Sequence, residues 1–490
     1  MKIMIRGILS VFLIFSLVQV HGQKQVKKPN VILIFMDDLG YGDLTSYGAL
    51  DYQTPIIDKM ASEGVRFTNF YAAQAVCSAS RAALLTGSYP NRVGIYGALS
   101  PFVDFGLNPE EETIADVLLQ HGYQTGMVGK WHLGHQEPLL PHHQGFQTYV
   151  GLPYSNDMWP VGVDGKKKTV PNKSNGRLAP PLPLLKSKMG STKVDTIKII
   201  DSHDDQAELT ETYTKAAIDF IQENKNKPFF LYLAHSMPHV PIAASKKFKG
   251  KSKQGPYGDV LEEIDWSVGE ILYTLKKLKI DEQTLVVFLS DNGPWLNYGD
   301  HGGNSAGLRE GKGTSWEGGM RVPCIVRWPK HIGPGQINNK LASAIDILPT
   351  IVQLTGASLP KEKIDGVDIS GLFFGLDVEP RTEFYYYYNQ NDLEAVRKGS
   401  WKLVFPHRFR TYEETLPKNG GYGGAVENKR IDSLALYDLR RDPGERYNVL
   451  DLYPDKVKEL QKIAEKARAD LGDNLTKRPG ANLRKAAVIK

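Results

Sequence analysis

Short apolar runs alternate along most of the chain with segments that carry apolar residues at helical spacing. Four runs have the character of buried strands, at residues 31–36, 125–128, 229–234 and 285–289. One helix is predicted between Thr54-Pro55, which form a start signal, and Gly64, which is the stop signal. Further helices are predicted over residues 113–120, 209–220 and 261–275. Such alternation is typical of βαβ units. We therefore expect an α/β fold with a large, mostly parallel central sheet and helices on both faces.

The pattern changes after Gly375. Aromatic, alternating segments follow at residues 384–388, 395–397, 401–405 and 435–439, and a helical pattern spans residues 457–467. These features predict a small antiparallel sheet with a terminal helix. The expected organisation is one large domain over residues 23–375 and a small α+β subdomain over residues 376–490.

Residues 1–22 have the order of a secretory signal peptide. Lys2 and Arg6 precede an apolar run over residues 7–20, and a polar stretch follows over residues 21–28. The run is short for a membrane span, although an uncleaved anchor is the alternative. We expect cleavage near Gly22 and a secreted or periplasmic protein that has no membrane segment afterwards.

Composition narrows the classes of function. The 490 residues include 60 Lys and Arg against 55 Asp and Glu, so no global polycation indicates a nucleic-acid partner. Any site that binds an anion must therefore depend on a local group of basic residues. The basic loops at residues 166–188 and 246–253 are either solvated or face a polyanionic substrate. The only cysteines, Cys77 and Cys324, exclude a disulfide scaffold, a four-cysteine zinc site and a CxxC redox pair.

Acidic pairs follow two of the predicted strands. Asp37 and Asp38 come directly after residues 31–36, and Asp291 and Asn292 come just after residues 285–289. Either pair alone would suit a turn or a helix cap. Because ligands bind at the carboxyl ends of parallel strands, both pairs are expected at one rim. Three carboxylates and an amide oxygen form the hard oxygen site that Ca²⁺ or Mg²⁺ accepts.

Cys77 precedes a segment that looks helical. At a helix N-terminus, free N–H groups and the helix dipole favour an anion, so a thiolate there could act as a nucleophile. The alternative is a structural cysteine among apolar neighbours. Ser78, Ser80 and Arg81 argue against a purely apolar packing role.

Several motifs together resemble the formylglycine-dependent type I sulfatases, in particular the arylsulfatase A-like branch of the alkaline phosphatase superfamily. The family's maturation signature is resembled by Cys77, Ala79 and Arg81 together with the Leu-Thr-Gly that follows. Two positions depart from it: Ala79 replaces the commoner proline, and Ser88 stands where arginine often follows. The resemblance covers residues 30–450 and includes residues 37–42, 126–134, 151–157, 238–241, 291–293, 311–319, 436–439 and 442–445.

This resemblance implies a role for each matching residue. Cys77 would be oxidised to Cα-formylglycine, whose hydrated aldehyde is the nucleophile and also a metal ligand. The other metal ligands would be Asp37, Asp38, Asp291 and Asn292, with Ca²⁺ expected ahead of Mg²⁺. Arg81 would pair with the nucleophile, and Lys130 and Lys312 would bind sulfate. His132 would be the base, and His239, assisted by Lys312, would be the general acid. Ser155 would contact the substrate.

Two further histidines are less specific. His235 follows the same strand as His239 and is interpreted as structural. His301 lies in a glycine-rich stretch before Lys312 and is expected either to touch the sugar or to cap a loop.

The expected protein is an exported, calcium-dependent sulfatase that acts on a sulfated carbohydrate. The basic loops, with His407, Arg408 and Arg410, would suit a polyanionic glycan. Its other partner would be a formylglycine-generating or anaerobic maturation enzyme. Two alternatives stay open: a phosphomonoester or phosphonate hydrolase on the same fold, and a catalytically silent binder of sulfated glycans. The sugar, the sulfated position and endo or exo action are left open.

Overall fold

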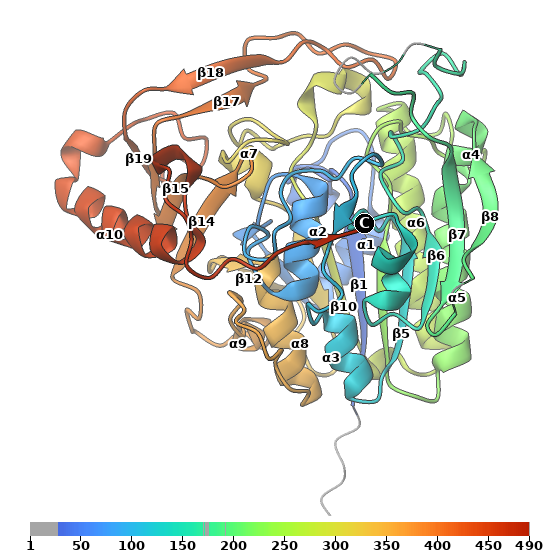
Figure 1. Cartoon of the computed structure of the whole chain (residues 1–490). Coiled ribbons are helices and arrows are strands. Elements are labelled where there is room, and N and C mark those ends of the chain that lie inside the picture. Colours follow the sequence, from blue (N-terminus) through green and yellow to red (C-terminus); the bar gives the residue numbers. More distant parts are fainter. Residues whose placement is uncertain (1–27, 170, 172–175, 192, 490) are drawn as a thin grey trace, which may run out of the picture.

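The central feature of the computed structural model is a ten-stranded sheet in the order β12-β2-β11-β10-β1-β9-β5-β6-β7-β8 (Figure 1). The structure describes residues 28–169, 171, 176–191 and 193–489. The expected signal peptide lies outside these residues. Within them, no helix combines the length and the apolar character that crossing a membrane requires.

The middle of the sheet is parallel and deeply buried. It consists of β10 (Thr284–Ser290), β1 (Asn30–Met36), β9 (Phe229–Ala234), β5 (Gln124–Gly129) and β6 (Thr148–Gly151). The four predicted strands are thus confirmed. Every residue of β1, β9 and β10 is buried, which explains their continuous apolar runs, because helices cover both faces of the sheet.

The edges of the sheet are largely antiparallel. β11 (Cys324–Arg327) runs antiparallel to β10 and to β2 (Val65–Phe67), which pairs in parallel with β12 (Gln336–Asn338). On the other side β7 (Leu182–Lys188) and β8 (Asp195–Ile200) form an antiparallel extension. The prediction of a loop through residue 188 was therefore wrong, because the exposed Lys186 and Lys188 alternate with buried residues on a strand.

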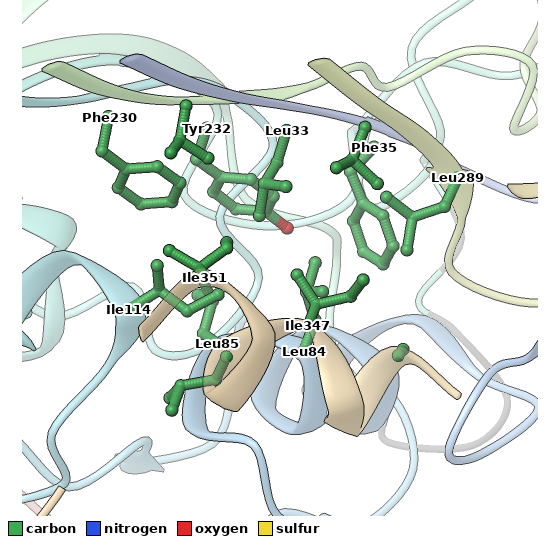
Figure 2. Packing of buried hydrophobic residues seen from close by; sticks show 14 of the residues in the cluster. Leu33, Phe35, Leu84, Leu85, Ile114, Phe230, Tyr232, Leu289, Ile347 and Ile351 are labelled. Carbon is green, nitrogen blue, oxygen red and sulfur yellow. The ribbon is translucent and has the colours of Figure 1, made fainter. Parts of the chain in front are cut away.

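Helices pack on both faces of the sheet, as expected. On one face Leu33 and Phe35 of β1 contact α2 (Cys77–Thr86) and α8 (Ile347–Thr355), as Figure 2 shows. Ile32 and Ile34 point to the opposite face and pack with α1 (Pro55–Ser62), α5 (Leu209–Asn224) and α6 (Pro256–Lys277). The alternation of β1 side chains therefore joins two cores through one strand.

Helix starts follow the sequence signals only in part. α3 (Ile114–Gln120) begins with a capping box between Thr113 and Asp116. Pro55 opens α1, but Thr54 makes no side-chain cap. Its hydroxyl instead lies 2.9 Å from that of Thr45. Thr54 thus takes the expected N-cap position, but its side chain does not cap the helix because a neighbouring hydroxyl competes for it.

The C-terminal part forms the expected antiparallel sheet with a helix. Its strands are β14 (Glu383–Tyr388), β15 (Asp392–Lys398), β16 (Trp401–Val404) and β19 (Ala435–Asp438), covered by α10 (Pro454–Leu471). A separate hairpin of β17 (His407–Thr411) and β18 (Glu427–Ile431) lies above α7 (Glu317–Met320) in Figure 1. Neither strand of this hairpin was among the segments predicted from the sequence.

The remaining elements are short. They are β3 (Phe70–Tyr71), β4 (Phe105–Gly106), β13 (Ala342–Ser343), β20 (Ala487–Val488), α4 (His203–Ala207), α9 (Ser370–Phe373) and the 3₁₀ turns η1 (Thr45–Tyr47), η2 (Glu137–Leu139), η3 (Pro141–His143), η4 (Asp281–Gln283), η5 (Leu296–His301), η6 (Ala344–Asp346), η7 (Leu450–Leu452) and η8 (Asn474–Thr476).

Candidate active site

The two acidic pairs lie side by side at the carboxyl ends of β1 and β10. These strands are in register, with Met36 opposite Ser290, so the residues that follow meet at one rim. The backbone N–H of Asp38 donates to Asp291 Oδ1 at 3.0 Å. The side-chain amide of Asn292 donates to Asp38 Oδ1 at 2.7 Å. Parallel pairing thus creates a buried acidic centre from residues about 250 positions apart.

This acidic centre fits a hard divalent cation. Asp37 Oδ1 and Asn292 Oδ1 are both buried, and neither accepts a hydrogen bond from any residue that the structure describes. One oxygen each from Asp37 and Asp38 and a ring nitrogen of His239 lie within 4.8 Å of one another. Burial, together with the charge of Asp37, raises the pKa of Asp291 to about 7. A cation among these oxygens would satisfy the orphaned atoms and favour the ionised carboxylates.

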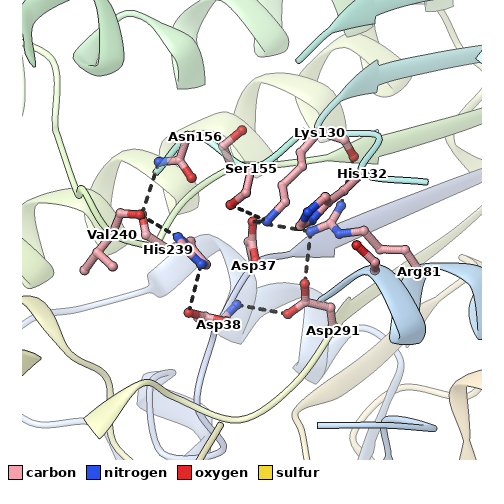
Figure 3. Close-up of polar contacts among 12 residues, drawn as sticks. Asp37, Asp38, Arg81, Lys130, His132, Ser155, Asn156, His239, Val240 and Asp291 are labelled. Atoms are coloured by element: carbon pink, nitrogen blue, oxygen red, sulfur yellow. Dashed lines mark hydrogen bonds and ion pairs between the residues drawn. The ribbon is translucent and has the colours of Figure 1, made fainter. Parts of the chain in front are cut away.

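Three buried cations surround the carboxylates, and two of them, Arg81 and Lys130, are labelled in Figure 3. Lys130, which follows β5, lies 2.5 Å from Asp37 Oδ2. Arg81 of α2 donates to Asp291 Oδ2 at 3.0 Å and to the Lys130 carbonyl at 2.9 Å. Lys312 Nζ lies 2.7 Å from Asp38 Oδ1. Each buried charge therefore has a partner of opposite sign, which stabilises an otherwise costly arrangement.

These cations control the charge of Asp37. Burial alone would raise its pKa, but Lys130, His239, Arg81 and Lys312 together hold the pKa far below its usual value. Asp37 is therefore ionised at every physiological pH. It is consequently available as an anionic ligand or as the partner of Lys130.

Cys77 occupies the first turn of α2 and faces the same centre. The extended backbone of Val76 leads into the helix, and Cys77 is only 2% exposed. Burial raises the pKa of the thiol, although the charges of Lys130 and Lys312 act in the opposite direction. An unmodified Cys77 would therefore be a neutral thiol at neutral pH and a weak nucleophile.

The ring of His132 is held in one tautomer. Its Nε2 lies 2.8 Å from the carbonyl oxygen of Leu99, which can only accept, so Nε2 carries the proton. Nδ1 is buried and has no hydrogen-bond partner within the described part of the chain. Burial, followed by the charge of Lys130, lowers the pKa of His132 well below its usual value. A neutral imidazole with a free Nδ1 lone pair has the form of a proton acceptor.

His239 lies on the other side of the centre. Its Nδ1 is 2.5 Å from the carbonyl of Val240, and its Nε2 is 3.6 Å from Asp38 Oδ2. Trp295 lies edge-on to the imidazole at 5.6 Å, and the Lys312 amine lies 4.5 Å from the centre of the same indole ring. His239 Nε2 therefore points toward the carboxylates, as a proton donor to a leaving group would.

Ser155 joins this group, because its hydroxyl accepts from Lys130 Nζ at 3.0 Å. Its neighbour Asn156 holds the segment of His239, donating at 3.4 Å to the His239 carbonyl. His235 is buried behind the site, with Nε2 3.3 Å from the hydroxyl of Ser267. Burial lowers the pKa of His235 to about 4, and its contacts are those of a structural residue.

His301 stands apart from the other candidates. Its ring lies beside Gly421. His301, Gly421 and Pro241 all line one cavity of ≈ 640 Å³. Lysines of the basic loop at residues 246–253 line the same cavity, opposite Asp204, Glu208, Glu211 and Asp259. This loop therefore contributes to a cavity of mixed charge and not to a purely cationic surface.

Sequence analysis missed the residues that brace these loops. Asp43 accepts from the backbone N–H groups of Gly40 and Asn304 and from the Tyr257 hydroxyl, at 2.6, 2.7 and 2.6 Å. It thereby ties the loop after β1 to a segment more than 250 positions later. Tyr388, at the end of β14, packs on Cys77 from the C-terminal part. No local pattern marks either contact.

The charge distribution indicates the class of enzyme. Buried cations around a single nucleophile position at a helix N-terminus suit hydrolysis of an ester whose acid is a multiply charged oxyanion. Comparison with known families agrees. The Sulfatase model matches residues 29–357, the model for the C-terminal region of aryl-sulfatase matches residues 379–486, and that for the C-terminal part of N-sulphoglucosamine sulphohydrolase matches residues 311–411.

Relatives point the same way. The chain is 39% identical to human (Homo sapiens) arylsulfatase A over 88% of its length and 85% of the relative. It is 36% identical to human N-acetylgalactosamine-6-sulfatase over 86% of this chain and 81% of the relative. The chain belongs to the sulfatase family and is a sulfuric ester hydrolase.

Solved structures share the fold. PsFucS1 sulfatase from Pseudoalteromonas sp. superposes with a TM-score of 0.81 at 30% identity, covering 94% of this chain and 92% of that one. Ps i-CgsB in complex with k-i-k-neocarrahexaose gives a TM-score of 0.69 at 27% identity, covering 90% and 92%. The expected fold, with a mostly parallel sheet and a small C-terminal antiparallel sheet, is confirmed.

Proposed function

We propose that this sulfatase is exported and releases sulfate from a sulfated carbohydrate, with Cys77 oxidised to Cα-formylglycine and Ca²⁺ at the acidic centre. The observation that carries the proposal is the position of Cys77, buried at the start of α2 and facing Lys130 and Lys312. The names of two similar proteins, an N-acetylgalactosamine-6-sulfatase and Ps i-CgsB in complex with a neocarrahexaose, support a glycan as the substrate.

The acidic centre supports a hard cation as cofactor. Asp37, Asp38, Asp291 and Asn292 would hold it through oxygen atoms, the donor type that Ca²⁺ and Mg²⁺ prefer. When bound, the cation would supply Lewis acidity toward a sulfate oxygen and favour the ionised form of the attacking hydroxyl. The orphaned oxygens of Asp37 and Asn292 are the observation behind this assignment.

The high pKa of the Cys77 thiol supports conversion of this residue. A hydrated aldehyde at position 77 would supply a hydroxyl that attacks sulfur and a second one that lets sulfate leave without attack by water on sulfur. Arg81, fixed by Asp291 and the Lys130 carbonyl, keeps its positive charge beneath this position. Conversion of a thiol to an aldehyde is an oxidation, so we also propose a formylglycine-generating or anaerobic maturation enzyme as a partner.

The chain's own residues would bind the substrate and move its protons. Lys130 and Lys312 bind the non-bridging sulfate oxygens, exchanging part of their contact with Asp37 and Asp38 for the sulfate anion. His239 Nδ1 donates to the Val240 carbonyl, so Nε2 carries a proton only when the ring is doubly protonated; in that form Nε2 gives its proton to the departing alcohol oxygen as the bond from that oxygen to sulfur breaks. His132 Nδ1 then accepts a proton from position 77 as sulfate departs. Ser155 steadies Lys130 during both steps.

Mass spectrometry of the peptide that contains Cys77 tests the nucleophile. Active enzyme should show conversion of the thiol to an aldehyde, and an unmodified thiol in fully active enzyme would refute the proposal. Cys77→Ser should lose turnover and keep the fold. Cys324→Ala is the matched control, because Cys324 is a buried cysteine of β11 that is not among the candidate site residues.

Substrate class is tested with a sulfate and a phosphate ester of the same phenol. Preference for the sulfate ester supports the proposed reaction, and preference for the phosphate ester would favour a phosphomonoester hydrolase. A screen of defined sulfated oligosaccharides then identifies the sugar.

Export and domain division need separate tests. Fractionation of the producing cells tests export. Limited proteolysis near residue 375 tests the proposed division into residues 23–375 and 376–490.

A further inference from the structure

One arginine of the C-terminal hairpin reaches the loop that carries Lys312. Arg410 lies near the end of β17, and its guanidinium rests directly on Gly313. A Cβ atom at position 313 would lie 2.8 Å from both Cζ and Nε of Arg410, so only glycine admits this close approach. Two cationic side chains therefore flank one glycine, Lys312 from its own loop and Arg410 from the hairpin.

The end of β17 is tied firmly to this loop. The Tyr412 hydroxyl donates to the carbonyl of Lys312 at 2.6 Å, and the Tyr412 backbone N–H donates to Glu310 Oε2 at 2.8 Å. These bonds hold the hairpin against the catalytic loop. The backbone that carries Arg410 is therefore held beside the Lys312 loop by the fold.

Arg410 differs in its partners from several other buried arginines. Arg92, Arg327 and Arg381 each lie within 2.6 Å of a carboxylate oxygen. Within the described part of the chain, no carboxylate lies within the 4.0 Å of an ion pair from Arg410. Its neighbours are the tyrosines at positions 388 and 412. A partly buried guanidinium without a counter-ion is suited to an anion that arrives from outside.

Tyr388 connects Arg410 to the nucleophile position. Its ring packs on Val76, Cys77 and Ala79, and it interacts electrostatically with both Arg410 and Lys312. Arg410 thus borders the same space as Cys77, on the side that the C-terminal part forms. A substrate that places one sulfate at Cys77 would have its sugar ring beside Tyr388.

We propose that Arg410 forms a second anion-binding site, which takes a sulfate or carboxylate of the substrate other than the sulfate ester that is cleaved. This inference rests on the proposed function and makes its substrate class more specific: a glycan with at least two anionic groups close together. A guanidinium binds either oxyanion through two parallel N–H donors, which fixes the orientation of the sugar.

The structure also selects Arg410 among the three basic hairpin residues that the sequence offered. His407 is buried, with Nε2 facing Glu394 at 3.4 Å, so it cannot contact a glycan. Arg408 is exposed and lies two residues further from the Gly313 contact on the same strand. It therefore provides the matched control.

The experiment compares Arg410→Gln with Arg408→Gln on two oligosaccharides that differ by one sulfate next to the scissile one, and on an aryl sulfate. Losing a charged hydrogen-bond partner should lower kcat/KM for the disulfated sugar by roughly 10-fold more than for the aryl sulfate. The loss should appear as a higher KM, because Arg410 binds the second anion equally well in the enzyme–substrate complex and in the transition state. Arg408→Gln should keep the wild-type ratio, and Arg410→Lys should recover part of it.

Two outcomes would overturn the inference. An equal loss on all three substrates would mean that Arg410 only supports the Lys312 loop, and an unchanged ratio in Arg410→Gln would mean that it binds no anion. Absence of sulfate release by wild-type enzyme from every substrate would instead count against the proposed function. Circular dichroism of each variant shows whether it folds.

Discussion

The guanidinium of Arg81 joins Asp291, at the end of β10, to the main-chain carbonyl of Lys130, at the end of β5, with distances of 3.0 and 2.9 Å. These two strands are separated in the sheet by β1 and β9. One side chain of α2 therefore holds two sides of the active site together. Because it is completely buried, Arg81 makes these bonds without competition from water.

Replacing Arg81 by Lys should disrupt the site although the charge is kept. An ammonium cannot form the forked contact to both Asp291 and the Lys130 carbonyl. We expect a loss of about 2–4 kcal/mol in the free energy of unfolding and at least a tenfold loss in kcat. Urea unfolding and steady-state kinetics measure the two effects. Wild-type kcat in Arg81→Lys would show that charge alone is sufficient.

His132 and His235 form an informative pair of substitutions. Both are buried neutral histidines, but only His132 has its free Nδ1 at the catalytic centre. His132→Gln should lower kcat about 10²-fold or more, as expected for loss of a general base. His235→Gln should mainly lower the melting temperature, since it alters the contact with Ser267. Comparable losses of kcat in both variants would contradict the assignment of His132.

Removing the divalent cation should lower both activity and thermal stability. Asp37, Asp38 and Asp291 would then repel one another in a buried site, and two oxygens would lack partners. Dialysis against a chelator should reduce Tm, and Ca²⁺ should restore it in a concentration-dependent way. Asn292→Leu should weaken this Tm response while leaving the carboxylates in place. A Tm insensitive to chelator and Ca²⁺ would rule out a bound cation at this centre.

The sequence predicted those parts of the site that depend on local order. A continuous apolar run precedes the metal-ligand candidates Asp37, Asp38, Asp291 and Asn292. Parallel pairing of β1 and β10 necessarily brings the ends of these strands together. Cys77 similarly precedes a helical pattern that folds as α2. Local periodicity is sufficient in these cases because one strand or one helix determines the direction of the side chain.

Contacts between distant segments could not be predicted in the same way. Tyr388 packs on Cys77 only because the C-terminal sheet docks against α2, and Asp43 finds Asn304 across the fold. His301 lies in a motif-rich segment, and η5 places it in the lining of a cavity beside Pro241. The strand β7 was hidden by its exposed lysines. Docking of whole elements decides each of these positions, and no single segment encodes it.

A buried pair in the C-terminal sheet should make stability depend on pH. His407 Nδ1 lies 2.7 Å from the Phe405 carbonyl and so carries the proton, which leaves Nε2 as an acceptor 3.4 Å from Glu394 Oε2. Burial raises the pKa of Glu394 from 4.5 to about 8 and lowers that of His407 from 6.5 to about 4. Near neutral pH the folded protein therefore contains a protonated Glu394 that faces a neutral imidazole.

The sign of the pH effect follows from these two pKa values. Between pH 4.5 and 8 the unfolded chain releases the Glu394 proton and the folded protein keeps it, so this group lowers stability as pH rises. Glu394→Gln keeps a donor toward His407 and removes the titration. The variant should therefore gain stability relative to wild type by up to about 1.4 kcal/mol per pH unit across this range. Denaturant unfolding at pH 5 and 8 measures the difference, and an equal difference at both values would show that Glu394 is already ionised in the folded protein.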